Sequence, residues 1–168
     1  MAMSAVPYSY SGDPAVGSFP DDRPLVIFDG YCGLCSRSVQ FILRQDKAGE
    51  FRFLQTQSAL GTTIYQHYGL ATDNYETLIL LVDGKLYTGS DAVLSVLARL
   101  GAPWSYLRLA RILPLPLRDW LYRLVASHRM RFFGRTEACY LPTAGQRARF
   151  IDGGRVGREP TAVLEGEL

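Results

Sequence analysis

The sequence has few cysteines, little net charge and no long hydrophobic run. Three cysteines in 168 residues, an odd number, do not suit the disulfide framework of a small secreted protein. A formal net charge of +2 gives no strong field to attract a nucleic acid. The longest apolar runs, 25–28 and 78–82, are too short to span a bilayer, and residues 1–20 lack a secretory signal. We therefore expect a cytoplasmic protein without a transmembrane segment or a nucleic-acid partner.

Two of the three cysteines lie together in one short stretch. Residues 25–35 read Leu-Val-Ile-Phe-Asp-Gly-Tyr-Cys-Gly-Leu-Cys, which predicts a strand, a tight turn and a Cys-x-x-Cys that opens a helix. A run that is apolar at every position is typical of a strand covered on both faces of an α/β sheet. In a reducing compartment a Cys-x-x-Cys indicates catalysis or metal binding more often than a structural role.

The next elements predict an α/β fold. Apolar spacing predicts helices from Cys35 to about residue 45, over 58–68 and over 90–100, and strands over 51–55, 77–82 and 85–88. Ser58 begins the second helix, Ser90 is the expected N-cap of the third, and Asp83-Gly84 predicts a two-residue hairpin. Helical connections between the first three strands favour parallel pairing among them. The order β-α-β-α-β-β-α resembles the thioredoxin fold.

The composition changes on both sides of this core, which we place at residues 23–102. Residues 1–22, rich in Ser, Gly, Pro and Asp, predict a flexible N-terminal arm, and residues 143–168 predict a poorly ordered tail. Residues 103–142 predict a helical extension packed on the core, with one helix over 104–113 and another that Gly134 ends. The second helix has one apolar face, formed by Leu117, Trp120, Leu121, Leu124, Val125, His128 and Phe132.

The residues around the cysteines resemble those of a known family. The run Asp29-Gly30-Tyr31-Cys32-Gly33-Leu34-Cys35 is similar to the Asp-Cys-Cys signature of the DCC family of predicted thiol-disulfide oxidoreductases. The resemblance covers about residues 24–142 and extends to Gly89-Ser90-Asp91-Ala92, His128-Arg129, Phe133-Gly134 and Cys139. It implies a thioredoxin-like fold and a protein or small-molecule disulfide or dithiol as the partner.

The two cysteines are assigned different roles. Dithiol exchange needs a thiolate that attacks and a second thiol that resolves the mixed disulfide. Cys32 is expected at a helix N-terminus, where unpaired N–H groups favour a thiolate, whereas Cys35 is expected to be more buried. This makes Cys32 the nucleophile and Cys35 the resolving thiol. Metal or cluster binding, and a pair of buried structural thiols, stay open as alternatives.

Five further residues complete the predicted site. Asp29 is expected to form an Asx turn, and with a pKa raised by burial it would also accept the proton of Cys35. Gly30 and Tyr31, in the same turn, are expected to contact the substrate. Ser90 and Asp91 match the helix start with which glutaredoxin-like and glutathione-transferase-like proteins hold glutathione, although a plain N-cap explains them too. Glutathione is therefore a candidate co-substrate, and no resident cofactor is expected.

One departure from the thioredoxin pattern concerns proline. Thioredoxins and glutaredoxins place a cis-proline before the third strand, but here that stretch reads Asn74-Tyr75-Glu76-Thr77. The difference favours an alternative in which a non-enzymatic thioredoxin-like module binds a partner protein or a metal. His128 and Cys139 are read first as structural residues and second as metal ligands beside the site.

Overall fold

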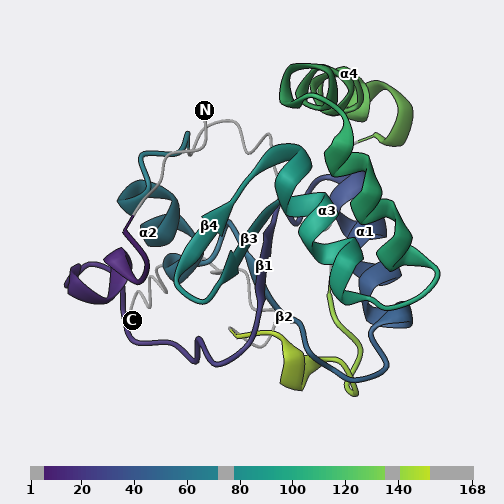
Figure 1. Ribbon diagram of the computed structural model, residues 1–168. Helices are drawn as coiled ribbons and strands as arrows, with labels where there is room; N and C mark the ends of the chain where they lie inside the picture. Colours follow the sequence, from purple (N-terminus) through teal and green to yellow (C-terminus); the bar gives the residue numbers. More distant parts are fainter. Residues whose placement is uncertain (1–5, 72–77, 135–140, 152–168) are drawn as a thin grey trace, which may run out of the picture.

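The computed structural model describes residues 6–71, 78–134 and 141–151, which form a layered α/β structure (Figure 1). A mixed sheet of order β2-β1-β3-β4 is built from β1 (Leu25–Phe28), β2 (Arg52–Gln55), β3 (Ile79–Val82) and β4 (Lys85–Tyr87). Helices α1 (Gly33–Gln45) and α3 (Gly89–Arg99) cover one face, and α2 (Ala59–His67) covers the other. The predicted α/β class is confirmed, and the arrangement is that of a thioredoxin-like fold.

The pairing of β1 with both neighbours corrects one prediction. Strand β2 runs parallel to β1, with Val26 opposite Phe53, but β3 runs antiparallel to it, with Val26 opposite Leu80. The expectation that the first three strands are all parallel is therefore wrong. The alternation of helices and strands does not determine at which end of the sheet β3 begins, and therefore does not determine its direction. The eleven residues 68–78 between α2 and β3 can span roughly 35 Å and return to either end of the sheet.

Local turn and cap signals have mixed outcomes. The predicted hairpin is present, and Asp83 and Gly84 both have positive φ, 49° and 71°, as a type I′ turn requires. Ser58 caps α2 by accepting the Gly61 N–H at 3.0 Å. The prediction for Ser90 is wrong, because the N-cap of α3 is Thr88. Ser90 lies inside the first turn, where its hydroxyl donates to the helix α4 described below.

The sheet separates two apolar clusters. On β1, Val26 and Phe28 face the layer of α1 and α3, whereas Leu25 and Ile27 face α2. All four side chains are at most 1% exposed, as expected for a strand covered on both sides. Cys32 and Cys35 belong to the cluster on the side of α1 and α3.

Residues 6–22 contribute to the opposite cluster. Tyr10, in a short 3₁₀ helix (Ser9–Gly12), is 4% exposed and Val16 is 8% exposed. His67 at the end of α2 lies between Ser9, whose Oγ is 3.0 Å from Nε2, and Asp13, whose Oδ2 is 2.7 Å from Nδ1. This chain of side chains ties the N-terminal segment to α2. The expected boundaries at 22, 102 and 142 stay predictions.

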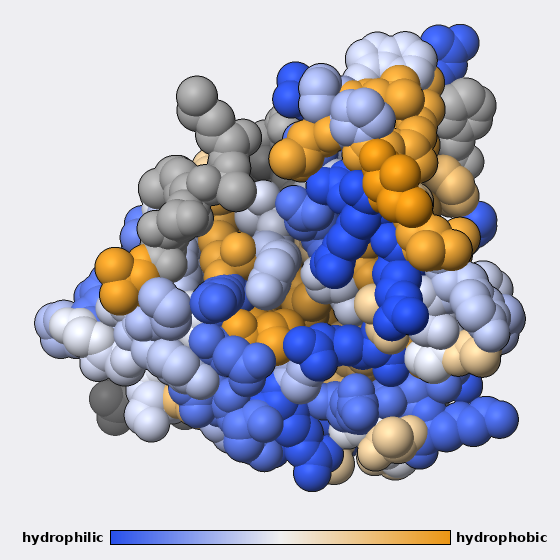
Figure 2. Space-filling model, in the orientation of Figure 1, coloured by the Kyte–Doolittle hydropathy of each residue, from blue (hydrophilic) through white to orange (hydrophobic). Residues whose placement is uncertain are grey.

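The C-terminal helices add a partly exposed apolar surface. A 3₁₀ helix (Trp104–Ile112) precedes α4 (Leu115–Phe133), which lies against α1 and α3. Much of the apolar face predicted for this helix is open to solvent, and Figure 2 shows the apolar surface on α4. The residues of that face that are each 44–58% exposed are Leu117, Trp120, Leu121, Leu124 and Val125.

The segment after residue 140 returns to the sheet. Phe150 forms a parallel bridge with Phe53 at the outer strand β2, and the Ile151 N–H donates to the Phe53 carbonyl at 3.0 Å. The guanidinium of Arg149 donates to the Phe51 carbonyl at 3.1 Å and to the Asp46 carboxylate. The edge of β2 is thereby covered, which protects unpaired backbone groups from another strand.

Candidate dithiol site

Cys32 lies where the sequence predicts it, at the start of α1. It is the N-cap residue of the helix, and its Sγ accepts the N–H of Cys35 at 3.3 Å. A backbone N–H aimed at sulfur, together with the positive end of the helix dipole, stabilises a thiolate.

The predicted difference in burial between the two cysteines is wrong. Cys32 is 1% exposed and Cys35 is 7% exposed, so the expected nucleophile is the more buried of the two. The reason lies in α4, whose C-terminal end covers the start of α1. The Gly33 N–H, next to Cys32, donates to the Gly134 carbonyl at 3.3 Å. The sequence contains no local pattern that reports this contact, because the two glycines are distant along the chain.

The turn before Cys32 is held by side-chain hydrogen bonds. Asp29 Oδ1 accepts the Tyr31 N–H at 3.0 Å, which is the expected Asx turn. The Asp29 carbonyl accepts the Cys32 N–H at 3.3 Å. Asp29 itself is 7% exposed. Its role as a proton acceptor for Cys35 stays a prediction.

Gln57 is a site residue that sequence reasoning missed. Its Nε2 donates to Asp29 Oδ1 at 2.6 Å, and its Oε1 accepts the Gly30 N–H at 3.1 Å. Both groups of the amide are thus used to fix the turn. Gln57 follows β2 closely, and the carboxyl ends of the parallel strands β1 and β2 lie side by side. The carboxyl ends of neighbouring parallel strands meet at one edge of a sheet, so a polar side chain just after β2 could have been predicted to reach the turn after β1.

We expect Gln57→Ala to lower the free energy of unfolding by about 1–3 kcal/mol, since it leaves the Gly30 N–H unpaired in a partly buried turn. Urea unfolding measures the change. Gln66→Ala, on the exposed side of α2, is the matched control and should change stability by less than about 0.5 kcal/mol. Equal effects of the two substitutions would show that Gln57 does not hold the turn.

The start of α3 is tied to α4. Ser90 Oγ donates to Asp119 Oδ1 at 2.7 Å, and Arg118 Nη2 donates to Asp91 Oδ1 at 2.7 Å. The neighbouring Ala92 packs in the cluster that contains the cysteines. The predicted residues Asp29, Gly30, Tyr31, Cys32 and Cys35 thus lie in one continuous segment that runs from the turn after β1 into the first turn of α1, whereas the two α3 residues contact α4. Their predicted contact with glutathione stays a prediction.

The remaining predicted residues are placed only in part. His128 is partly exposed, and its Nδ1 lies 2.9 Å from the Leu124 carbonyl and 3.0 Å from Ser127 Oγ. Cys139 and the proline-free stretch 74–77 lie outside the described residues. Within the part of the chain that is described, no group of three or more His, Cys, Asp or Glu residues is placed to hold a metal ion.

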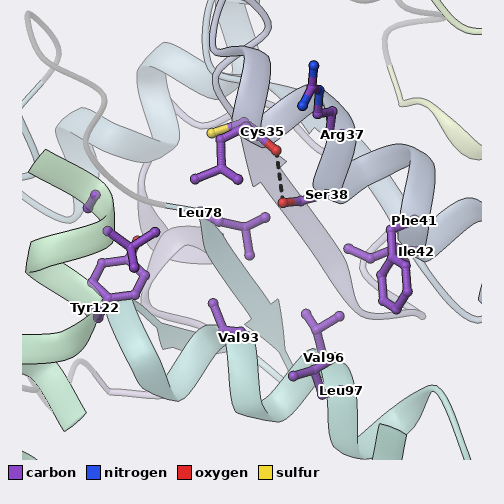
Figure 3. Close-up of a pocket in the computed structure, with 13 residues that line it drawn as sticks. Cys35, Arg37, Ser38, Phe41, Ile42, Leu78, Val93, Val96, Leu97 and Tyr122 are labelled. Carbon is purple, nitrogen blue, oxygen red and sulfur yellow. Dashed lines mark hydrogen bonds between the residues drawn. The ribbon is translucent and has the colours of Figure 1, made fainter. Parts of the chain in front are cut away.

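A cavity of about 320 Å³ adjoins the dithiol (Figure 3). Helix α1 provides one wall, α3 a second and α4 a third, with Leu78 between them. Cys35 lines the cavity, whereas Cys32 is not among the lining residues. The structure therefore gives the cysteine pair an apolar pocket on the side of Cys35.

The fold and the site together define the class of protein. A Cys-x-x-Cys follows the first strand of a thioredoxin-like sheet and opens the next helix, with one sulfur accepting a helix N–H. The model of the DCC1-like thiol-disulfide oxidoreductase family matches residues 26–135. The chain belongs to this family, as the resemblance of its cysteine motif implied, and the family description indicates a redox function.

Two curated proteins are similar to this chain over most of its length. YuxK of Bacillus subtilis (strain 168) is 35% identical over 127 residues, which cover 76% of this chain and 93% of YuxK. The DCC family protein At1g52590, chloroplastic, of Arabidopsis thaliana is 34% identical over 122 residues, covering 72% of this chain and 71% of the plant protein. No solved structure matches the chain significantly. Among the described residues, no helix has the length and apolar character needed to cross a membrane.

Proposed function

We propose that the protein is a thiol-disulfide oxidoreductase that cycles Cys32 and Cys35 between dithiol and disulfide. The observation that carries the proposal is the Cys35 N–H donated to Cys32 Sγ at 3.3 Å at the start of α1. This donor stabilises negative charge on the sulfur that must attack. The partner is a protein or small-molecule disulfide or dithiol in the cytoplasm, with glutathione as a candidate co-substrate.

The reductive cycle consists of two exchanges. The Cys32 thiolate attacks one sulfur of the substrate disulfide, forms a mixed disulfide and releases the first substrate thiolate, which takes up a proton. Cys35 then loses its proton to the Asp29 carboxylate and attacks the Cys32 sulfur. The bond between Cys32 and the substrate breaks, and the second thiolate leaves with a proton. The substrate gains two electrons, and the protein ends with a Cys32–Cys35 disulfide.

Single cysteine variants test this cycle. In Cys35→Ser the mixed disulfide on Cys32 should accumulate, because the resolving thiol is missing. In Cys32→Ser we expect turnover of hydroxyethyl disulfide to fall by a factor on the order of 10³ or more, as for other nucleophile deletions. Mass spectrometry detects the first effect and a coupled thiol assay the second. Ser127→Ala, at an exposed position on α4 away from the two cysteines, is the control substitution and should leave turnover unchanged.

The reduction potential of the pair decides whether the cycle exists. In glutathione buffers of graded composition, wild-type protein should convert fully between dithiol and Cys32–Cys35 disulfide. If the two cysteines never oxidise to each other in these buffers, the proposal is wrong.

A second candidate is a non-enzymatic module that binds a partner protein or a metal through the same surface. The 1% exposure of Cys32 favours it, because a buried sulfur is poorly placed to meet a bulky disulfide. Elemental analysis of freshly purified protein tests the metal branch. Stoichiometric zinc or iron that Cys32→Ser removes would support this candidate over the oxidoreductase.

A further inference from the structure

The cavity beside Cys35 has the size and lining of a small-molecule site. Its volume of about 320 Å³ lies at the lower end of the range for ligand pockets, roughly 300–1,000 Å³. The aliphatic and aromatic side chains that form its walls are Leu34, Phe41, Ile42, Leu78, Val93, Val96, Leu97, Tyr122 and Val125. Such a lining favours an alkyl or aryl group over a polar peptide.

The position of the sulfur in this cavity restricts what the ligand carries. Cys35 lies one helical turn before Ser38 and two before Ile42, so the thiol stands at one end of the wall formed by α1 (Figure 3). Cys35 and Cys32 pack in the same cluster. If the disulfide of a bound molecule occupies this end of the cavity, it lies against the dithiol. The apolar part of the molecule then extends between α1, α3 and α4.

One charge lies at the edge of the cavity. Arg37 is the only charged residue among the described residues that line it. The residue is exposed, and its guanidinium lies over the Phe133 ring, 5.5 Å from the ring centroid. The carbonyl of Phe133 borders Gly33, so this guanidinium lies at the dithiol end of the cavity. The described residues that line the rest of the cavity are uncharged, which suits an uncharged apolar body.

We propose that this cavity binds an apolar small-molecule disulfide, and that this is the substrate class of the dithiol. The inference rests on the proposed function. The exchange follows the two steps given above. Cys32 forms the mixed disulfide with a substrate whose apolar body occupies the cavity. Cys35 then forms the bond to Cys32 and releases the second apolar thiol into the cavity, so that two electrons pass from the dithiol to the substrate.

The rate constants for two disulfides test the selectivity. Lipoic acid joins an alkyl chain to a disulfide, whereas hydroxyethyl disulfide has only short, polar arms. Ala126→Phe fills the cavity from α4, and we expect the ratio of the lipoic acid rate to the hydroxyethyl disulfide rate to fall at least about tenfold. Val93→Phe fills it from the α3 side, at a residue that is 36% exposed and tolerant of a larger side chain, with the same expected result. Leu124→Phe, on α4 but outside the lining, should keep the ratio. A rate ratio unchanged in both cavity-filling variants would overturn the assignment of the cavity.

Binding without redox chemistry separates this inference from the proposed function. Octanoate has a comparable apolar chain but no disulfide, and calorimetry should detect its binding to wild-type protein and the loss of this binding in Ala126→Phe. If octanoate binds in this way but neither disulfide is reduced, the proposed function is wrong and the pocket stands. If hydroxyethyl disulfide is reduced but octanoate does not bind, the pocket is wrong and the proposed function stands.

Discussion

Replacing Gly33 by alanine is expected to lower the free energy of unfolding by about 1–3 kcal/mol, because the new methyl group meets backbone atoms. An ideal Cβ at Gly33 would lie 2.5 Å from the Phe133 carbonyl oxygen and 3.1 Å from that of Gly134. These atoms belong to the end of α4 and cannot rotate away as a side chain would. The end of α4 must therefore move away from α1.

This displacement should expose the dithiol. The N–H of Gly33 donates to Gly134 at 3.3 Å, and the contact covers the neighbouring Cys32. In Gly33→Ala, Cys32 should react faster with an alkylating agent under native conditions, and urea unfolding should show the lower stability. Gly17→Ala is the control, since a Cβ there has no atom within 4 Å. Unchanged alkylation and unchanged stability in Gly33→Ala would mean that α4 does not cover the site.

Replacing Phe150 by alanine is expected to cost about 3–5 kcal/mol, the usual range for a phenylalanine removed from a core. Phe150 is 5% exposed, stacks on Phe53 with ring centroids 5.3 Å apart and meets the edge of Phe28 at 6.3 Å. Its loss leaves a cavity in the cluster that also contains Cys32 and Cys35. Chemical unfolding followed by far-UV circular dichroism measures the effect.

Leu141→Ala is the matched control for this prediction. It removes an apolar side chain from the same C-terminal segment, but Leu141 is 72% exposed. Its effect should stay within about 0.5 kcal/mol. A loss of less than about 1 kcal/mol for Phe150→Ala would contradict the packing of residues 141–151 against β2.

Features that depend on neighbours along the chain could be predicted. The apolar run 25–28 becomes β1, Cys32 begins α1, Ser58 caps α2 and the Asp83-Gly84 turn joins β3 to β4. The Asx turn of Asp29 is equally local, since its acceptor and donor are two residues apart. Each of these depends on backbone conformation and hydrogen bonds within a few residues, which the residue types themselves favour.

Features that depend on residues far apart in the sequence could not be predicted. The sequence predicts Ser90 as a helix cap, but its hydroxyl donates a hydrogen bond to Asp119. The neighbouring Asp91 pairs with Arg118. The burial of Tyr10 and Phe150 could not be predicted either. Both residues lie in segments without apolar periodicity and yet are 4% and 5% exposed. An isolated aromatic side chain carries no pattern, and only the packing of a whole layer determines whether it is covered.

The dithiol shows both sides of this division. Two cysteines three residues apart after an apolar run are enough to predict a helix start at which one sulfur can accept a helix N–H. Contacts between distant parts of the chain place Gly134 over this end of the helix, let Gln57 hold the turn and make Cys35 rather than Cys32 face a cavity. Short-range backbone geometry sets a helix start, whereas access to a sulfur depends on every element packed around it.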